Sequence, residues 1–191
     1  GFLREVRLNL DSKKINQIPC KTALSPSRLP GLNYALNPYR GCAHACIYCY
    51  APFVLRERRE WGKFVDVKYN ITRILEGELR KKKKGVVGIG TVTDAYQPTE
   101  KKTEITRRCL EALLRYDFPI SIQTKSDLIL RDLDVIKKFS ERDVGITLTT
   151  FDDTLRRTYE PYSSSVEERL DVLARLHSKG IETWAFIGPI M

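Results

Sequence analysis

The sequence lacks the features that would mark a membrane protein or a repeat protein. Its 191 residues contain no apolar run near the roughly 18 residues that a membrane-spanning helix needs. No repeat at solenoid spacing and no low-complexity linker is visible. The hydrophobic share of 42% is ordinary for a soluble protein, and the length suffices for one domain with a sizeable core. We therefore expect a single soluble, cytoplasmic domain with no membrane partner.

Cysteine is scarce and odd in number. Five cysteines cannot all pair within one chain, so a disulfide framework is not expected. Three of the five lie close together in residues 41–50, GCAHACIYCY, with the spacing C-x3-C-x2-C. Cys20 and Cys109 lie outside this motif. Cys109 falls on the apolar face of a predicted helix, where a cysteine usually behaves as a small hydrophobe.

The motif cysteines, Cys42, Cys46 and Cys49, predict an iron–sulfur site. Three thiolates can hold three irons of a [4Fe–4S] cluster and leave the fourth iron open to another ligand, whereas clusters that only carry electrons usually have four cysteine ligands. The alternative is a nucleic-acid-binding module with a structural Cys3His zinc site that includes His44. Against zinc, His44 lies inside the loop formed by the cysteines, and no second C-x2-C pair follows.

Short strand patterns alternate with amphipathic helix patterns along the chain. The strands are expected at about residues 35–39, 86–92, 120–124, 144–150 and 183–187. The helices are expected at about residues 70–79, 100–116, 128–139 and 165–180. Asn70 is the expected cap of the first helix, and the pair Ser165 and Glu168 forms a capping box before the last, which stops at Gly180. The alternation predicts an α/β fold with a parallel sheet and right-handed crossovers.

The residues around the cysteines carry a family resemblance. The run LNPYRGC at residues 36–42 delivers the first motif cysteine, and YCYA at residues 48–51 follows the second; residues 21–34 form a similar lead-in. Together they resemble the radical S-adenosylmethionine (SAM) superfamily, in particular the group related to spore photoproduct lyase. The resemblance implies a partial (βα)6 barrel, open on one side, with the cluster on the loop after the first strand.

Only five barrel strands are found in the pattern, so we expect a barrel truncated after the fifth strand. We expect residues 1–34 to form an N-terminal extension and lead-in, and residues 35–191 to form the partial barrel. The two belong to one domain overall. Barrel enzymes carry their chemistry at the carboxyl ends of the strands, where this sequence has polar or Gly/Pro-rich segments.

The resemblance also implies the cofactors and the class of reaction. A [4Fe–4S] cluster would bind SAM and, with an electron from a donor such as flavodoxin or ferredoxin, cleave it to a 5′-deoxyadenosyl radical. The substrate is not fixed: nucleic acid, in a DNA-repair role, is one candidate, and a protein or small metabolite is another. The resemblance would suggest a cysteine near Thr91 or Val92 that returns a hydrogen atom. The sequence has none there, so we do not expect thymine-dimer reversal by that route.

The resemblance places a set of polar and aromatic residues near SAM: Tyr48, Tyr50, Thr93, Lys125, Thr147, Thr149 and Ile187. Lys125 would pair with the SAM carboxylate, Thr93 would lie near SAM, and Thr147 would contact the ribose, with Thr149 beside it. The two tyrosines and Ile187 would pack near the adenine. The alternatives are an exposed cation for Lys125, ordinary strand positions for the threonines and core positions for the tyrosines.

An acidic and polar cluster follows the second expected strand, in residues 93–100. Asp94, Gln97 and Glu100 could bind the SAM amino group or the substrate. The plainer alternative is that Pro98 and Thr99 start a helix and that Glu100 suits its positive end.

The chain is basic, with 33 Lys and Arg against 24 Asp and Glu, a formal charge of +9 and a pI of about 9.4. This balance favours anionic partners, including nucleic acid. The run at residues 80–84 ends a helix and should lie at the barrel end opposite the cysteines. Arg56, Arg58, Arg59 and Trp61 are nearer the cysteines and are better candidates to contact a phosphate-rich substrate, with a surface helix as the alternative.

Overall fold

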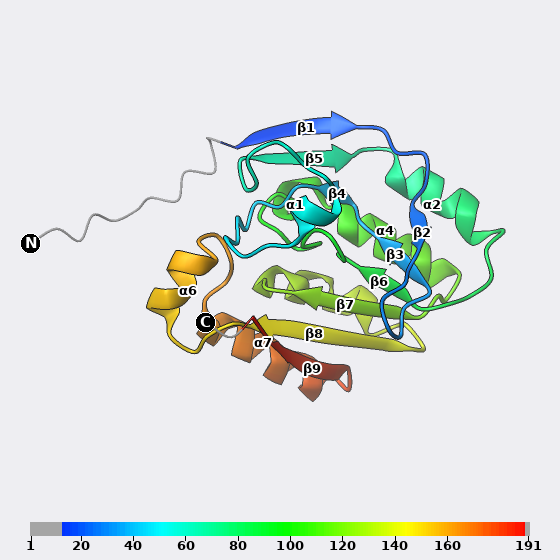
Figure 1. Cartoon of the computed structure of the whole chain (residues 1–191). Coiled ribbons are helices and arrows are strands. Elements are labelled where there is room, and N and C mark those ends of the chain that lie inside the picture. Colours follow the sequence, from blue (N-terminus) through cyan, green and yellow to red (C-terminus); the bar gives the residue numbers. More distant parts are fainter. Residues whose placement is uncertain (1–12, 190–191) are drawn as a thin grey trace, which may run out of the picture.

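The computed structural model describes residues 13–189, which form two β-sheets and a layer of helices (Figure 1). The larger sheet has six strands in the order β2-β3-β6-β7-β8-β9. Its strands are β2 (Leu24–Pro26), β3 (Tyr34–Leu36), β6 (Val87–Ile89), β7 (Ile120–Thr124), β8 (Arg142–Leu148) and β9 (Glu182–Ile187).

The predicted parallel sheet is confirmed. Strands β3, β6, β7, β8 and β9 are parallel neighbours in chain order, and β2 adds antiparallel to β3. The register aligns Leu36 with Ile89, Ile89 with Ile122, and Ile122 with Val144. The carboxyl ends of the parallel strands therefore meet at one edge of the sheet. The fold is α/β with mixed sheets.

A smaller sheet, which the sequence did not predict, lies beside the first. It consists of β1 (Lys14–Ile18), β5 (Phe64–Lys68) and β4 (Tyr39–Arg40), in the order β1-β5-β4. Strand β1 is parallel to β5 and β4 is antiparallel to it. This sheet brings three segments together at the start of the cysteine motif. The expected domain boundary at residue 34 stays a prediction, and residues 1–12 and 190–191 lie outside the described part of the chain.

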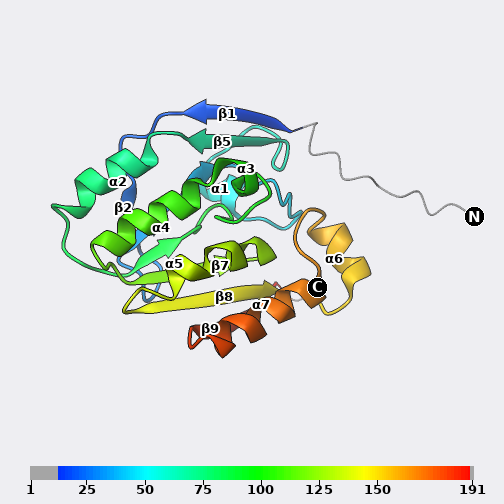
Figure 2. The same cartoon turned by 180° about the vertical axis from the view of Figure 1, so that it is seen from behind.

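The helices that follow the larger sheet's strands cover one of its faces, as the two opposite views show (Figures 1 and 2). The elements are α1 (Ala51–Val54), α2 (Ile71–Leu79), α3 (Glu100–Thr103), α4 (Ile105–Arg115), the 3-10 helix η2 (Asp127–Asp132), α5 (Leu133–Ile136), α6 (Asp153–Tyr159) and α7 (Val166–Ser178). Helix α6 lies beyond the end of β8, away from the helical layer (Figure 1). Within the described residues, no helix is long and apolar enough to cross a membrane.

The last helix begins and ends as predicted. The Ser165 side chain accepts a hydrogen bond from the Glu168 backbone and Glu168 returns one to the Ser165 backbone, which is the expected capping box. Gly180 follows the helix with φ +70°, a left-handed conformation that favours glycine. The first helix differs from the prediction, because Asn70 does not cap it. Its side chain instead makes two hydrogen bonds with the Cys20 backbone, at 2.8 and 2.9 Å.

The expected helix at residues 100–116 is two helices. Glu104 has φ 50° and separates α3 from α4. The cause is Glu100, which is fully buried and accepts a hydrogen bond from the backbone of Thr106 at 3.0 Å. The free amino end of α4 is capped in this way by a side chain from the preceding turn. The expected helix at 128–139 is also divided, into η2 and α5, with Ser126 as the cap of η2.

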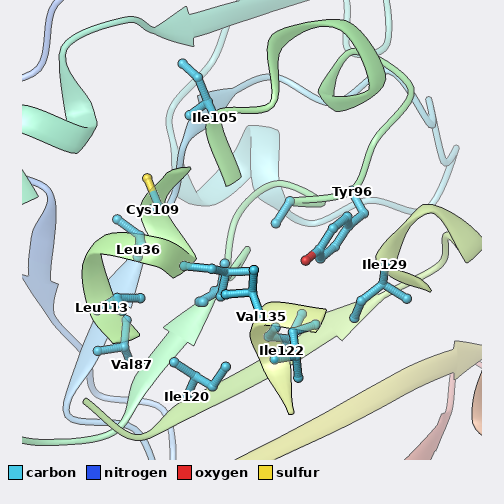
Figure 3. Packing of buried hydrophobic residues seen from close by; sticks show 14 of the residues in the cluster. Leu36, Val87, Tyr96, Ile105, Cys109, Leu113, Ile120, Ile122, Ile129 and Val135 are labelled. Atoms are coloured by element: carbon cyan, nitrogen blue, oxygen red, sulfur yellow. The ribbon is translucent and has the colours of Figure 1, made fainter. Parts of the chain in front are cut away.

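The apolar core lies between the larger sheet and the helical layer. Figure 3 shows residues of the strands, such as Ile120 and Ile122, against residues of α4 and α5, such as Leu113 and Val135. Cys109 has no exposed surface and belongs to this cluster, as predicted. A core of this kind fixes the sheet, and the sheet in turn fixes the loops at its carboxyl edge.

Candidate cofactor site

The three motif cysteines lie on one loop, residues 41–50, between β4 and α1. Cys42 and Cys46 are buried and Cys49 is half-buried, and all three are free thiols. Burial raises the pKa of each thiol, that of Cys46 to about 11. A bound metal or a nearby cation is what would favour the thiolate in such surroundings.

The cysteine loop packs closely against residues 61–64. Gly41 and Gly62 both have φ +88°, and neither has room for a side chain. A Cβ on Gly41 would lie 2.5 Å from the Phe64 carbonyl oxygen, and one on Gly62 would lie 2.4 Å from the Ala45 Cβ. Both glycines are therefore required by a close approach as well as by their backbone conformation.

The polar run after β6 holds the cysteine loop through side-chain hydrogen bonds to its backbone. The Ala43 N–H donates to Gln97 Oε1 at 2.7 Å, and Gln97 Nε2 donates to the Gly41 carbonyl at 3.2 Å. The Thr93 hydroxyl donates to the same carbonyl at 2.7 Å. Gln97 is fully buried and Thr93 nearly so. Thr93 thus contacts the cysteine loop, and its hydroxyl proton is engaged by the loop backbone. Its proximity to SAM stays a prediction.

Asp94 joins three segments at the edge of the sheet. Its carboxylate accepts hydrogen bonds from the Thr124 hydroxyl at 2.7 Å and the Lys125 N–H at 2.9 Å, and lies 3.3 Å from His44 Nδ1. Burial raises the pKa of Asp94, but the neighbouring His44, Lys125 and Thr124 outweigh this and hold the pKa well below its usual range. His44 therefore faces a carboxylate from the strand edge.

Lys125 is a cation at the carboxyl end of β7. Burial lowers its pKa, but the negative charges of Cys46, Asp94 and Glu160 raise it more, so the net pKa lies above the ordinary value. Its Nζ is 5.8 Å from the centroid of the Tyr48 ring. The prediction placed Lys125 at a strand end near the cysteines, and the structure places it there. Its pairing with the SAM carboxylate stays a prediction.

Tyr48 is held by a buried ion pair that sequence reasoning missed. Its hydroxyl donates to Glu160, which is fully buried and pairs with Arg169 on α7. Arg169 is 1% exposed and also donates to the Thr147 carbonyl at 2.9 Å. Burial raises the pKa of Glu160, but Arg169 and Tyr48 lower it more, and the net pKa lies below the ordinary value. No local motif signalled this pair, because its members lie outside the cysteine motif.

The two threonines at the end of β8 differ in what they bind. The Thr147 hydroxyl accepts a hydrogen bond from Gln123 at 2.9 Å. Thr149 is 5% exposed, and its hydroxyl has no hydrogen-bond partner among residues 13–189. A buried hydroxyl without a partner is uncommon and costs free energy, so Thr149 is the threonine that is open to a further ligand.

The remaining expected SAM neighbours, Tyr50 and Ile187, are exposed. The Tyr50 side chain is 59% exposed, and its hydroxyl donates to the Thr91 carbonyl. Ile187 is 60% exposed at the end of β9. Neither is a core residue. Their proximity to an adenine stays a prediction.

Lys13 is a second cation at the cysteine loop, and no motif in the sequence indicated it. It precedes β1, is 9% exposed and donates from Nζ to the Ala43 carbonyl. The same Nζ lies 3.5 Å from the centroid of the Tyr162 ring. Burial lowers the pKa of Lys13 to about 8. The unpredicted strand pairing of β1 with β5 is what brings this residue to the loop.

The basic residues after α1 differ in whether they form ion pairs within the protein. Arg59 forms ion pairs with Glu57 at 2.9 Å and Asp66 at 2.7 Å. Arg56 and Arg58 are exposed, and no ion pair to them is found among the described residues. Arg59 is therefore engaged within the fold, and only Arg56 and Arg58 are open to an anion.

Glu100, the last residue of the polar run at 93–100, stabilises the fold and is not free to bind SAM or substrate. Glu100 accepts from the Tyr39 hydroxyl and pairs with Arg131 at 2.7 Å, in addition to capping α4. Its full burial leaves no surface for a ligand. This agrees with the plainer alternative for Glu100, although its side chain caps α4 rather than the helix it begins.

The chain belongs to the radical SAM superfamily. The sequence model described as Radical SAM superfamily matches residues 36–190. The chain is 41% identical over 180 residues to an uncharacterized protein of Methanocaldococcus jannaschii, covering 93% of this chain and 68% of that protein. It is 30% identical over 210 residues to an uncharacterized protein of Mycobacterium tuberculosis, covering 100% of this chain and 60% of that protein.

The fold is similar to that of spore photoproduct lyase. A solved structure of a variant of that enzyme, with bound AdoMet and dinucleoside spore photoproduct, superposes with a TM-score of 0.73 at 16% identity. The match covers 99% of this chain and 56% of that chain. The present chain thus carries the domain of a radical SAM enzyme and spans little more than half of spore photoproduct lyase. The resemblance found in the sequence is confirmed at the level of family and fold.

The alternative of a structural zinc site is not favoured. His44 Nδ1 faces the Asp94 carboxylate at 3.3 Å, as described above. The family match concerns a superfamily of enzymes.

Proposed function

We propose that this chain binds a [4Fe–4S] cluster through Cys42, Cys46 and Cys49 and uses it to cleave SAM reductively. The observation that carries the proposal is a single loop that bears three largely buried thiols at the carboxyl edge of a radical SAM fold. When bound, the cluster would supply the one electron that breaks the S–C5′ bond of SAM and gives methionine and a 5′-deoxyadenosyl radical, a chemistry that the protein itself cannot provide.

The donor set fits a cluster with one open iron. Cys109 is in the apolar core, and the Cys20 backbone is bound to Asn70, so neither belongs to the loop of the three motif cysteines. Lys13 and Lys125 bring positive charge to a site whose thiolates would be negative. Charge and hydrogen bonds around the sulfurs are the means by which a protein adjusts a cluster's potential.

The chain's own residues would bind and orient SAM at this edge. The Lys125 ammonium is a suitable partner for the SAM carboxylate. The Thr149 hydroxyl lacks a partner and is a candidate hydrogen-bonding group for SAM, with Thr147 beside it. Tyr48, Tyr50 and Ile187 would form the surface near the adenine, and Thr93 would support the loop. The five parallel strands would be part of a (βα)6 barrel.

The substrate class proposed is nucleic acid. The solved spore photoproduct lyase contains a dinucleoside photoproduct. The net charge of +9 and the exposed Arg56 and Arg58 suit an anionic substrate. Reversal of a thymine dimer with hydrogen return from a cysteine near Thr91 is not proposed, because Cys109 is buried in the core. A low-potential donor such as flavodoxin or ferredoxin would supply the electron.

The test is anaerobic reconstitution of the chain with iron and sulfide. We expect about four irons per chain and, with dithionite and SAM, formation of 5′-deoxyadenosine. Replacing Cys42, Cys46 or Cys49 by alanine should abolish the product, whereas Cys20→Ala, outside the loop, should retain it. A full cluster that yields no 5′-deoxyadenosine would contradict the proposal.

The substrate class is tested separately by binding of DNA and RNA oligonucleotides at increasing salt. Phosphate contacts predict an affinity that falls steeply with salt. Arg56→Ala and Arg58→Ala together should reduce both the affinity and the salt dependence. Binding that is absent, or unchanged by these substitutions, would speak for a protein or small-metabolite substrate.

A further inference from the structure

Lys13 carries a buried ammonium group that the superfamily match does not cover. The residue is 9% exposed, and it lies outside residues 36–190, which the superfamily model matches. Among residues 13–189, no carboxylate forms an ion pair with it. A buried cation without an anion costs free energy, so the surroundings of Lys13 call for a negatively charged group.

The smaller sheet determines where this ammonium lies. Lys13 directly precedes β1, which lies beside β5 (Figure 1). The N–H of Lys14, the first residue of β1, donates to the Lys63 carbonyl at 2.9 Å. Phe64, the next residue on β5, packs on Gly41 at the start of the cysteine loop. The backbone of Lys13 is therefore held beside the cysteine loop by strand pairing.

The Lys13 side chain contacts the cysteine loop between the first two motif cysteines. Its Nζ donates a hydrogen bond to the Ala43 carbonyl and lies 3.5 Å from the centroid of the Tyr162 ring. The Tyr162 N–H donates to the next carbonyl of the loop, that of His44, at 3.4 Å. Because Ala43 follows Cys42 directly and consecutive Cα atoms are about 3.8 Å apart, the ammonium lies within about 10 Å of the Cys42 Cα. The positive charge is thus fixed next to a motif cysteine.

We propose that Lys13 is a positioning residue of the cluster: its positive charge, held in place by the hydrogen bond to Ala43, raises the cluster's reduction potential. The inference rests on the proposed function, since it needs the three motif cysteines as ligands. Their thiolates would supply the negative charge that the buried ammonium lacks. An added electron makes the cluster more negative, so a fixed cation nearby stabilises the reduced cluster more than the oxidised one.

The first test compares cluster potentials without SAM. Wild-type protein, Lys13→Met, Lys13→Gln and Lys14→Met are reconstituted anaerobically, and the reduced fraction is followed by electron paramagnetic resonance during a redox titration at pH 7. Lys13→Met removes the charge and the donor, whereas Lys13→Gln removes the charge and keeps a neutral donor. Lys14→Met is the matched control, because it removes the same charge from the neighbouring position, where the side chain is exposed.

We expect equal iron contents, a shift to a more negative potential in both Lys13 variants, and a much smaller shift in Lys14→Met, since solvent screens an exposed charge. A wild-type potential in the fully loaded Lys13 variants, or an equal shift in Lys14→Met, overturns the inference and leaves the proposed function intact. Wild-type protein that binds no cluster overturns both, so iron content tells the two failures apart.

A second measurement uses the wild-type protein and does not depend on cluster uptake by a variant. Lysine labelled with 13C at Cε is incorporated, and nuclear magnetic resonance spectra are compared without the cluster and with the reduced, paramagnetic cluster. Cluster-free Lys13→Arg and Lys14→Arg proteins assign the two signals by their absence. The inference predicts that the cluster shifts or broadens the Lys13 signal far more than the Lys14 signal. Equal effects on the two signals overturn it.

Discussion

The interior of this protein is apolar beneath α4 and polar around the cysteine loop. Beneath α4, residues such as Leu113 and Ile122 contact one another with no exposed surface. Around the cysteine loop, the side chains of Gln97, Glu160 and Arg169 are as deeply buried as Leu113 and Ile122, but they form hydrogen bonds and an ion pair. Apolar packing depends on volume, whereas a buried polar group depends on a particular partner. The two regions should therefore respond differently to substitution.

The largest effect is expected where a buried charge loses its partner. Arg169→Met leaves Glu160 buried and uncompensated, and we expect the free energy of unfolding to fall by about 3–5 kcal/mol. Denaturant unfolding measures the change. Arg175→Met on the same helix is the control, since Arg175 pairs with Asp171 at 3.6 Å with both side chains 58% exposed, and it should cost less than about 1 kcal/mol. An equal loss in the free energy of unfolding for the two variants would mean that burial does not determine how much the Arg169–Glu160 ion pair stabilises the protein.

The next effect tests the apolar region. Leu113→Ala removes buried methyl groups from the core, and we expect a loss of about 2–5 kcal/mol in the free energy of unfolding. The iron bound per folded chain should not change, because the substitution does not touch the cysteine loop. Thermal unfolding and iron analysis together measure this. A loss of iron from protein that is still folded would show that the core and the loop are coupled.

A smaller cost in stability, with a larger loss of iron, is expected at Gln97. Gln97→Leu keeps much of the volume but leaves the Ala43 N–H without its acceptor, at a cost of about 1–3 kcal/mol. Because Ala43 follows Cys42, the iron content should fall even in folded protein. The contrast with Leu113→Ala sharpens the comparison. Full iron content in Gln97→Leu would show that the cysteine loop keeps its conformation without the hydrogen bond between Ala43 and Gln97.

The smallest effect is a pH dependence at the exposed side of the site. The hydrogen bonds from Arg59 hold the pKa of Glu57 well below its usual range. Since the folded-state pKa is depressed, this stabilisation is present above about pH 5 and is lost as the pH falls through the folded-state value. In Arg59→Met, the free energy of unfolding should therefore decline less between pH 5 and lower pH than in the wild type. The difference should be less than about 1 kcal/mol, because Arg59 is 43% exposed and its ion pair is screened by solvent. Acid unfolding curves of equal steepness would contradict this.

The sequence by itself determined the elements whose signals are local. The individual strand segments, the capping box at Ser165 and the C-x3-C-x2-C spacing depend on residues a few positions apart, and the family follows from runs of the same kind. Apolar periodicity likewise placed Cys109 in the core. Such features depend on backbone propensity and periodicity, which are properties of short segments.

Only the tertiary structure decided what surrounds the cysteines. Lys13 bonds Ala43 across 30 positions, and Tyr48 bonds Glu160 across 112. Strand β4 has two residues and β1 pairs with β5, so no periodicity could reveal the sheet that brings Lys13 in. The sequence also contains no sign that Glu104 interrupts a helix, because the cause is the buried side chain of Glu100. Contacts between distant segments depend on the whole fold, which is why the cysteine motif was readable in the sequence and its environment was not.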